Sequence, residues 1–251
     1  MLAVDLAPWQ IGIIGIALVF SGLIKGATGA GAPIFAIPVM AAIVDIKFAI
    51  LAMLVPNLMT NIWQAHRFRN RQPERRFLWR YVGGGAVGVI VGTVLLTTLS
   101  LDVLSIVVSA SVLIYVAFRL SRPDWKLSMD RASRLAVPAG ISAGILQGAT
   151  GLAAPALLTF LNALRLERMT FVATVSLVFV TFTIVHLISL GIGGLITIEA
   201  VVVSAIALAP IAAGMALGTR LLTILSARAF DRIVLLLLCV IAAWNIIQVL
   251  S

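Results

Sequence analysis

A glycine-rich break occurs twice inside long apolar segments of this sequence. Residues 22–33 read GLIKGATGAGAP and residues 144–155 read GILQGATGLAAP, with identical residues at seven aligned positions. A second match follows in the same order, GVIVGTVLLTTLS at 88–100 and GMALGTRLLTILS at 214–226. Two matches in one order indicate an internal duplication. We predict a first repeat at 1–122, a polar linker at 123–133 and a second repeat at 134–251.

The surroundings of these breaks place the chain in a membrane. Hydrophobic residues make up 62% of its 251 residues and charged residues 11%, whereas a soluble domain has about 25% charged residues. Apolar segments long enough to cross a bilayer recur along the chain, at 9–44, 46–64, 78–99, 101–118, 134–164, 169–190, 195–222 and 232–250. The composition therefore predicts an all-α polytopic membrane protein whose surroundings are lipid.

The net charge of +9 does not indicate a nucleic-acid partner. The basic residues stand in short clusters between apolar segments, which is the positive-inside pattern of membrane proteins. Cys239 is the single cysteine and the chain has two histidines, so the sequence offers neither an intramolecular disulfide nor a metal-ligand cluster. We expect no cofactor and no metal.

The first apolar segment of each half is too long for one span and is divided by GATG. Two interpretations are open: a broken helix that crosses once, or a re-entrant hairpin that returns to the side it entered from. Charge favours the hairpin. With hairpins, sixteen of the eighteen Lys and Arg residues lie on the cytoplasmic side, whereas single crossings leave eleven inside and six outside. We therefore predict two inverted repeats, each a broken, re-entrant helical hairpin plus three transmembrane helices.

A break in a membrane helix persists only where it is buried in protein or lines a cavity. In transporters with inverted repeats, broken helices turn free backbone groups toward the substrate. Proline at the start of the returning helix (Pro33 and Pro155) and glycine in the turn suit an anion-binding helix start. Hairpins that enter from opposite faces would bring the two tips close together. The predicted substrate-binding residues in the tips are Lys25, Gly26, Ala27, Thr28, Gly29, Gln147, Gly148, Ala149, Thr150 and Gly151.

Polar residues elsewhere in the apolar segments extend this site. Lys25 is a lysine inside a membrane segment, a position that indicates function, and its counterpart in the second copy is Gln147. Asn57 and Asn61 share one helix face and are added to the substrate-binding set, although helix–helix hydrogen bonding explains them equally well. Lys25 and His186 are the candidates for ion coupling. Gly84, Gly88, Gly92, Gly214 and Gly218 recur at four-residue spacing and are expected to serve helix packing.

At these residues the sequence resembles the sulfite exporter TauE/SafE family, also called the toluene sulfonate uptake permease family. The likeness covers nearly the whole chain: duplicated halves, a Gly-rich motif followed by proline in each, and a basic loop after the second segment. The run KGATG at 25–29 and the later PNLMTN at 56–61 are similar to one subgroup. The motif departs from glycine-richer versions at 30–32 (AGA) and 152–154 (LAA), which affects the expected shape of the pocket.

The resemblance implies a carrier for small anions, such as sulfite, organosulfonates or related small organic acids, in a bacterial cytoplasmic membrane. We predict a secondary transporter that works by alternating access; the alternative is an anion channel. The sequence shows neither a nucleophile–base constellation nor a metal cluster, so an enzyme is not expected.

The inverted arrangement predicts that both chain termini lie outside the cytoplasm. Reporter fusions of alkaline phosphatase and of green fluorescent protein to each terminus test this. Phosphatase activity without fluorescence is expected at both ends, because phosphatase folds outside the cytoplasm. A fluorescent amino-terminal fusion would contradict the inverted model.

Overall fold

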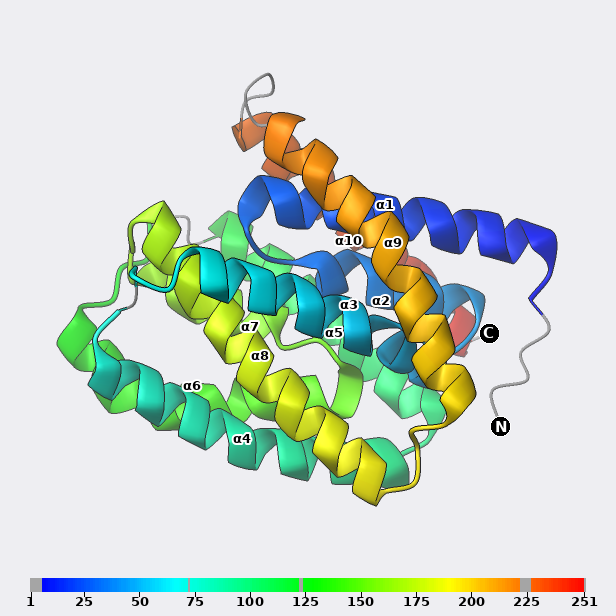
Figure 1. The fold of residues 1–251 in the computed structure, drawn as a ribbon, viewed down its shortest axis with the longest axis horizontal. Helices are drawn as coiled ribbons and strands as arrows, with labels where there is room; N and C mark the ends of the chain where they lie inside the picture. The colour runs from blue at the N-terminus through cyan, green and yellow to red at the C-terminus, as the bar shows by residue number, and fades with distance from the viewer. Residues whose placement is uncertain (1–5, 72, 122–123, 222–226, 251) are drawn as a thin grey trace.

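The computed structural model describes residues 6–71, 73–121, 124–221 and 227–250, and it contains α-helices throughout this part of the chain (Figure 1). The predicted boundary at 122/123 and the extreme termini lie outside the described residues. The helices are α1 (Pro8–Thr28), α2 (Ala32–Ile43), α3 (Ile46–Arg67), α4 (Arg75–Thr98), α5 (Leu101–Ser121), α6 (Met129–Thr150), α7 (Ala154–Ala163), α8 (Arg168–Ile192), α9 (Ile198–Leu221) and α10 (Ala227–Leu250). Among the described residues, six helices are long and apolar enough to cross a membrane: α1, α3, α4, α5, α8 and α9. The predicted all-α polytopic membrane fold is confirmed.

The first broken segment is a hairpin. Helix α1 ends where Gly29 takes a left-handed conformation (φ 83°) and donates its N–H to the Lys25 carbonyl. After Gly31 (φ 94°), α2 begins with proline in its first turn and runs back along α1 (Figure 1). Near the open end of the hairpin, the Gln10 side chain donates to the Ile43 carbonyl at 3.1 Å. A helix that continued across the membrane would place Gln10 and Ile43 at opposite ends of the segment.

The second broken segment repeats this geometry. Gly151 ends α6 in a left-handed conformation (φ 70°), and α7 begins with proline in its first turn. The Leu127 N–H, just before α6, donates to the Ala163 carbonyl at the end of α7 at 2.8 Å. Both segments therefore return to the end from which they start. The hairpin prediction is confirmed and the single-crossing alternative is wrong.

Helices α3 and α8 cross the middle of the molecule as an antiparallel pair (Figure 1). Ser176 donates to Gln64 at 3.2 Å, and Asn57 donates to Thr183 at 3.0 Å. Residue numbers fall along α8 as they rise along α3, so the two helices begin at opposite ends of the bundle. The first hairpin contacts this pair through α2, which packs on α3, and the second through α6 and α7, which contact α8.

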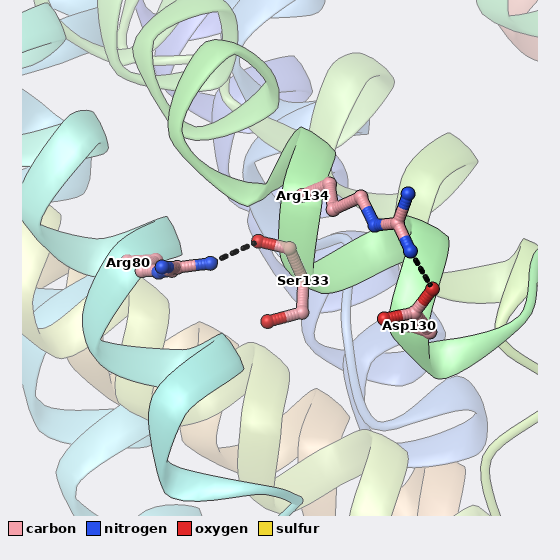
Figure 2. A network of polar contacts seen from close by, with 4 residues as sticks. All are labelled: Arg80, Asp130, Ser133 and Arg134. Carbon is pink, nitrogen blue, oxygen red and sulfur yellow. Dashed lines mark hydrogen bonds and ion pairs between the residues drawn. The ribbon is translucent and has the colours of Figure 1, made fainter.

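Most of the basic residues that the structure describes lie at one end of the bundle, which we call the basic end: residues 68–71, 73–74, 121, 124–128 and 164–167 with the adjoining helix ends. Arg71 pairs with Glu167 at 3.6 Å and Arg165 with Asp124 at 4.0 Å, which brings the three loops together. At the same end the Arg80 side chain donates to the Ser133 carbonyl, and Arg134 pairs with Asp130 (Figure 2). These contacts place the beginnings of α4 and α6 side by side.

Glycines let α1 pack along α9 and α4 along α6 at backbone distance. A Cβ added at Gly88 would collide with the Ile141 carbonyl, and one at Gly84 with that of Val137. We call these two close interfaces, α1 with α9 and α4 with α6, the helix seams. Residues that are equivalent in the sequence duplication make equivalent contacts in the two seams. The equivalent pairs are Gly22–Ile211 with Gly144–Gly85, Gly26–Met215 with Gly148–Val89, Gly214–Val19 with Gly88–Ile141, and Gly218–Leu23 with Gly92–Ile145.

Two consequences follow from these seams. The predicted packing role of Gly84, Gly88, Gly92, Gly214 and Gly218 is confirmed. The first helix of each hairpin, α1 or α6, packs along a helix of the other half, α9 or α4, through equivalent glycines. These reciprocal contacts agree with the duplication in the sequence.

Gly88→Ala is expected to destabilise the protein by about 1–3 kcal/mol, because overpacking a close contact costs about that much. Gly83→Ala is the matched control on the same helix, since an added Cβ there meets nothing within 4 Å. Alanine at an unobstructed helical site is neutral or mildly stabilising. Thermal unfolding in detergent measures both variants. Equal melting temperatures for the two would contradict the close-contact account.

Candidate functional site

Lys25 lies in the interior of the helix bundle. It is one turn before the end of α1, its residue is 1% exposed, and its ammonium group donates to Asn61 Oδ1 at 2.8 Å. Within the described residues it has no carboxylate partner. A buried cation without a counter-ion is costly in a low-dielectric interior. This position therefore favours the binding of an anion.

A chain of hydrogen bonds leads from Lys25 across α3 to α8. The Asn61 amide nitrogen donates to the Asn57 carbonyl and to Asn57 Oδ1, both at 2.7 Å. Asn57 in turn donates to Thr183 Oγ1 on α8 at 3.0 Å. These residues are 0–4% exposed. The structure thus brings three predicted site residues, Lys25, Asn57 and Asn61, into one polar network.

His186 lies one turn beyond Thr183 on α8 and is fully buried. Neither ring nitrogen has a partner that meets hydrogen-bond geometry, although the backbone of Gly148 lies beside the ring. A buried imidazole without partners keeps its donor and acceptor available to a proton, water or ligand. His186 thus lies between Thr183, at the far end of the network, and the backbone of Gly148 near the second tip.

The two hairpin tips differ because of one substitution. In the second tip, Gln147 Oε1 accepts the Ala153 N–H at 3.2 Å and closes the turn. The equivalent residue in the first tip is Lys25, whose ammonium group has only donors, so the Gly31 N–H lacks the acceptor of its counterpart Ala153. The threonines behave alike in both copies: Thr28 and Thr150 each donate to the carbonyl four residues earlier and accept an N–H of the turn.

Several predicted tip residues face protein rather than open space. Gly26 and Gly148 lie in the helix seams against the carbonyls of Met215 and Val89. Ala27 and Ala149 are each 4% exposed. These residues shape the hairpins, and their backbone rather than their side chains would meet a ligand.

The expectation that the two tips meet is wrong. Gly29 abuts Val172, near the start of α8, whereas Gly151 abuts Ile50, near the start of α3. Because α3 and α8 are antiparallel, these contacts lie about 25 Å apart along the pair at 1.5 Å per residue. Each hairpin extends past the middle of the bundle. The two tips therefore lie near opposite ends of the α3–α8 pair, and the polar network lies between them.

The first tip faces a cavity of about 210 Å³. Thr28, Ala30 and Gly31 line it on one side, and Arg119 and Asn162 on the other. Arg168 reaches the same tip, donating to the Ala27 carbonyl at 3.1 Å. Sequence reasoning missed these three side chains because they stand at helix ends, where a basic or polar residue is ordinarily interfacial. Only the return of the hairpin to the basic end brings them to the tip.

Within the described residues, six helices that can span a membrane, two helical hairpins and a buried polar network indicate a multi-pass membrane protein. Residues 14–244 match the family model for sulfite exporter TauE/SafE, which is nearly the whole chain. The protein therefore belongs to the TauE/SafE family of membrane transporters, whose members carry sulfite or related anions. No curated protein and no solved structure matched the chain.

Asn61→Leu is expected to destabilise the protein by about 1–3 kcal/mol, because it leaves buried polar groups of Lys25 and Asn57 unsatisfied. The double variant Lys25→Met/Asn61→Leu should recover part of this loss, since replacing both partners by apolar groups is nearly neutral. Thermal unfolding of the two single variants and the double variant measures the coupling between the side chains. Additive effects would show that the Lys25–Asn61 bond does not stabilise the fold.

Proposed function

We propose that this protein is a secondary transporter that carries a small anion across the bacterial cytoplasmic membrane by alternating access. Sulfite, an organosulfonate or a related small organic acid is the proposed substrate. The observation that carries the proposal is Lys25, a buried cation beside an open helix turn that has no carboxylate partner within the described part of the chain. Membership in an anion-transporter family supports the same substrate class.

The substrate would bind between the first tip and the polar network. Lys25 would supply the charge, and the Gly31 N–H would donate a hydrogen bond from the helix start. Asn57 and Asn61 hold the ammonium group in place through their hydrogen bonds. In the second tip, Gln147 would contribute hydrogen bonding without charge and would release the Ala153 N–H when the turn opens.

Alternating access would use the duplication. The proposed repeats are inverted in the membrane, with the basic end in the cytoplasm and both termini outside. The reciprocal glycine seams support this arrangement, because each hairpin has an equivalent surface on the other half to pack against. If the halves exchanged their conformations, the first tip would close and the second would open, and access would change sides.

Ion coupling would involve Lys25, at one end of the hydrogen-bonded chain, and His186, one helical turn beyond Thr183 at its other end. Both are buried ionisable groups within the membrane-spanning region. A proton gained or lost at either group would change the charge that the anion meets. This places the coupling candidates where substrate and proton influence each other electrostatically.

Counterflow in proteoliposomes tests the proposed function, with a panel of sulfite, sulfate, methanesulfonate and acetate. Lys25→Ala is expected to lower the rate at least tenfold. Lys25→Gln is a sharper variant, because it installs the residue that closes the second tip; it should fold and still lose transport. Lys47→Ala is the control, a lysine at the opposite end of the bundle, and should retain at least half of the rate.

The outcomes separate the alternatives. Saturable exchange that depends on Lys25 is expected of a carrier. Conductance without saturation or exchange would identify a channel instead. Lys25 variants as active as wild type would remove this residue from the mechanism.

A further inference from the structure

The basic end contains a second cavity, which we call the arginine pocket, of about 290 Å³. The end of α5 and the loop between α7 and α8 form it. Its lining includes Arg119, Arg165 and Arg168 together with Asn162 and Tyr115, and the described lining residues include neither Asp nor Glu. We propose that the arginine pocket binds a small oxyanion in free solution, as the cytoplasmic capture site from which the anion passes to the first tip. This assignment rests on the proposed transport function.

Two acidic residues near the pocket pair with arginines. Glu167 pairs with Arg71, with both side chains more than half exposed, and Asp124 is 99% exposed at 4.0 Å from Arg165. Neither carboxylate is part of the lining. Guanidinium groups present planar sets of N–H donors that fit the oxygens of sulfite, sulfonate, phosphate or carboxylate. The described lining thus has the donor chemistry of an oxyanion site.

The backbone at Arg165 adds an independent observation. Its φ is 51°, and it is the non-glycine residue with positive φ in the described part of the chain. A side chain other than glycine, Asn or Asp is rarely found in this left-handed region, which costs about 1 kcal/mol or more. The α7–α8 loop therefore holds an arginine where a glycine or asparagine would fit with less strain. The strain is accounted for if the guanidinium group is needed at the pocket.

The arginine pocket adjoins the cavity at the first tip. Both are lined by Tyr115, Arg119, Asn162 and Phe171. Arg168 also belongs to both regions, since it lines the pocket and donates to the Ala27 carbonyl of the tip. An anion held by Arg119 thus has the Gly31 turn on its inner side and Lys25 one helical turn further along α1. This continuity places the pocket on the route to the buried cation.

The headgroup of an anionic lipid offers the same chemistry as a free oxyanion. An apolar groove of about 520 Å³ adjoins the pocket on its outer side and shares Tyr115, Phe118 and Trp125 with it. We assign the pocket to the free anion because its inner side continues to the tip and because Arg168 bonds the tip backbone. Lipid binding is the competing outcome that the test must distinguish.

Titration of purified protein with sulfite and with methanesulfonate, in a neutral detergent without lipid, tests the pocket. Arg119→Gln and Arg168→Gln are each expected to raise the dissociation constant at least tenfold, and Arg119→Lys less. Arg165→Asn should weaken binding while leaving the melting temperature unchanged or higher, because asparagine tolerates the left-handed backbone. Arg134→Gln is the control at the same end of the bundle, where Arg134 pairs with Asp130 outside the pocket (Figure 2); it should change binding less than twofold.

Transport from each side separates this inference from the proposed function. In oriented proteoliposomes, Arg119→Gln should raise the KM for anion presented at the basic end and leave the KM at the other end unchanged. If Arg119→Gln abolishes sulfite binding while wild type shows no counterflow, the pocket stands and the transport function falls. If wild type transports and Arg119→Gln matches it in binding and in KM at both ends, the pocket is wrong and transport stands.

A lipid arm completes the test. The protein is reconstituted in nanodiscs of phosphatidylcholine alone or with phosphatidylglycerol, and retained lipid is measured by native mass spectrometry. Retention of phosphatidylglycerol that is lost in Arg119→Gln, with sulfite binding unchanged by the same substitution, would overturn the assignment to a free anion. Equal lipid retention by wild type and variant, with sulfite binding lost, supports it.

Discussion

The backbone groups freed at a helix break have no water to bind inside a bilayer, and the structure of this protein is arranged around two such breaks. Each break is closed locally, by a left-handed glycine, a threonine that bonds both sides of the turn, and a proline at the start of the returning helix. This local closure makes a hairpin that needs no partner at its tip to hold its shape. The N–H groups that remain are then available to a ligand.

Close packing of backbones holds the two halves together. In a bilayer, moving an apolar side chain from lipid to a helix interface gives little hydrophobic free energy. Membrane helices therefore associate through small residues that permit close approach. Here the glycines of α4 and α9 receive the carbonyls of α6 and α1, and the glycines of α6 and α1 receive those of α4 and α9. Because the same surfaces recur in both copies, a change of packing in one half has an equivalent in the other. The proposed alternating access would use these matching surfaces.

One difference between the repeats would make the proposed site positively charged. Gln147 completes the second tip as a neutral group, whereas Lys25 leaves the first tip open and adds a positive charge. The nearby arginines lie at the same tip and extend this positive region to the basic end. Along the proposed route, positive charge would decrease from the three arginines to Lys25 and then to the neutral amides and hydroxyl of Asn61, Asn57 and Thr183. A carrier of anions benefits from this order, since attraction is strongest at entry and binding in the middle stays weak enough for release.

The sequence by itself determined the class, the hairpins and the packing glycines. Membrane helices are specified by local composition, turns by glycine and proline, and the duplication by direct comparison of residues, so each can be read from neighbours along the chain. It also singled out Lys25, Asn57 and Asn61, because polar residues in an apolar segment stand out without any knowledge of the fold. The inverted orientation and the role of these residues in transport stay predictions.

Only the tertiary structure decided where the tips lie and what surrounds them. The hairpins were expected to meet, yet they overshoot, because the depth of a hairpin depends on the seam against which it packs and not on the length of its arms alone. Arg119, Asn162 and Arg168 come to the first tip from three separate places in the sequence. Their proximity arises from the antiparallel pairing of α3 with α8 and the return of α7 to the basic end. Contacts between segments far apart in sequence depend on global packing, and no local pattern in this chain encodes them.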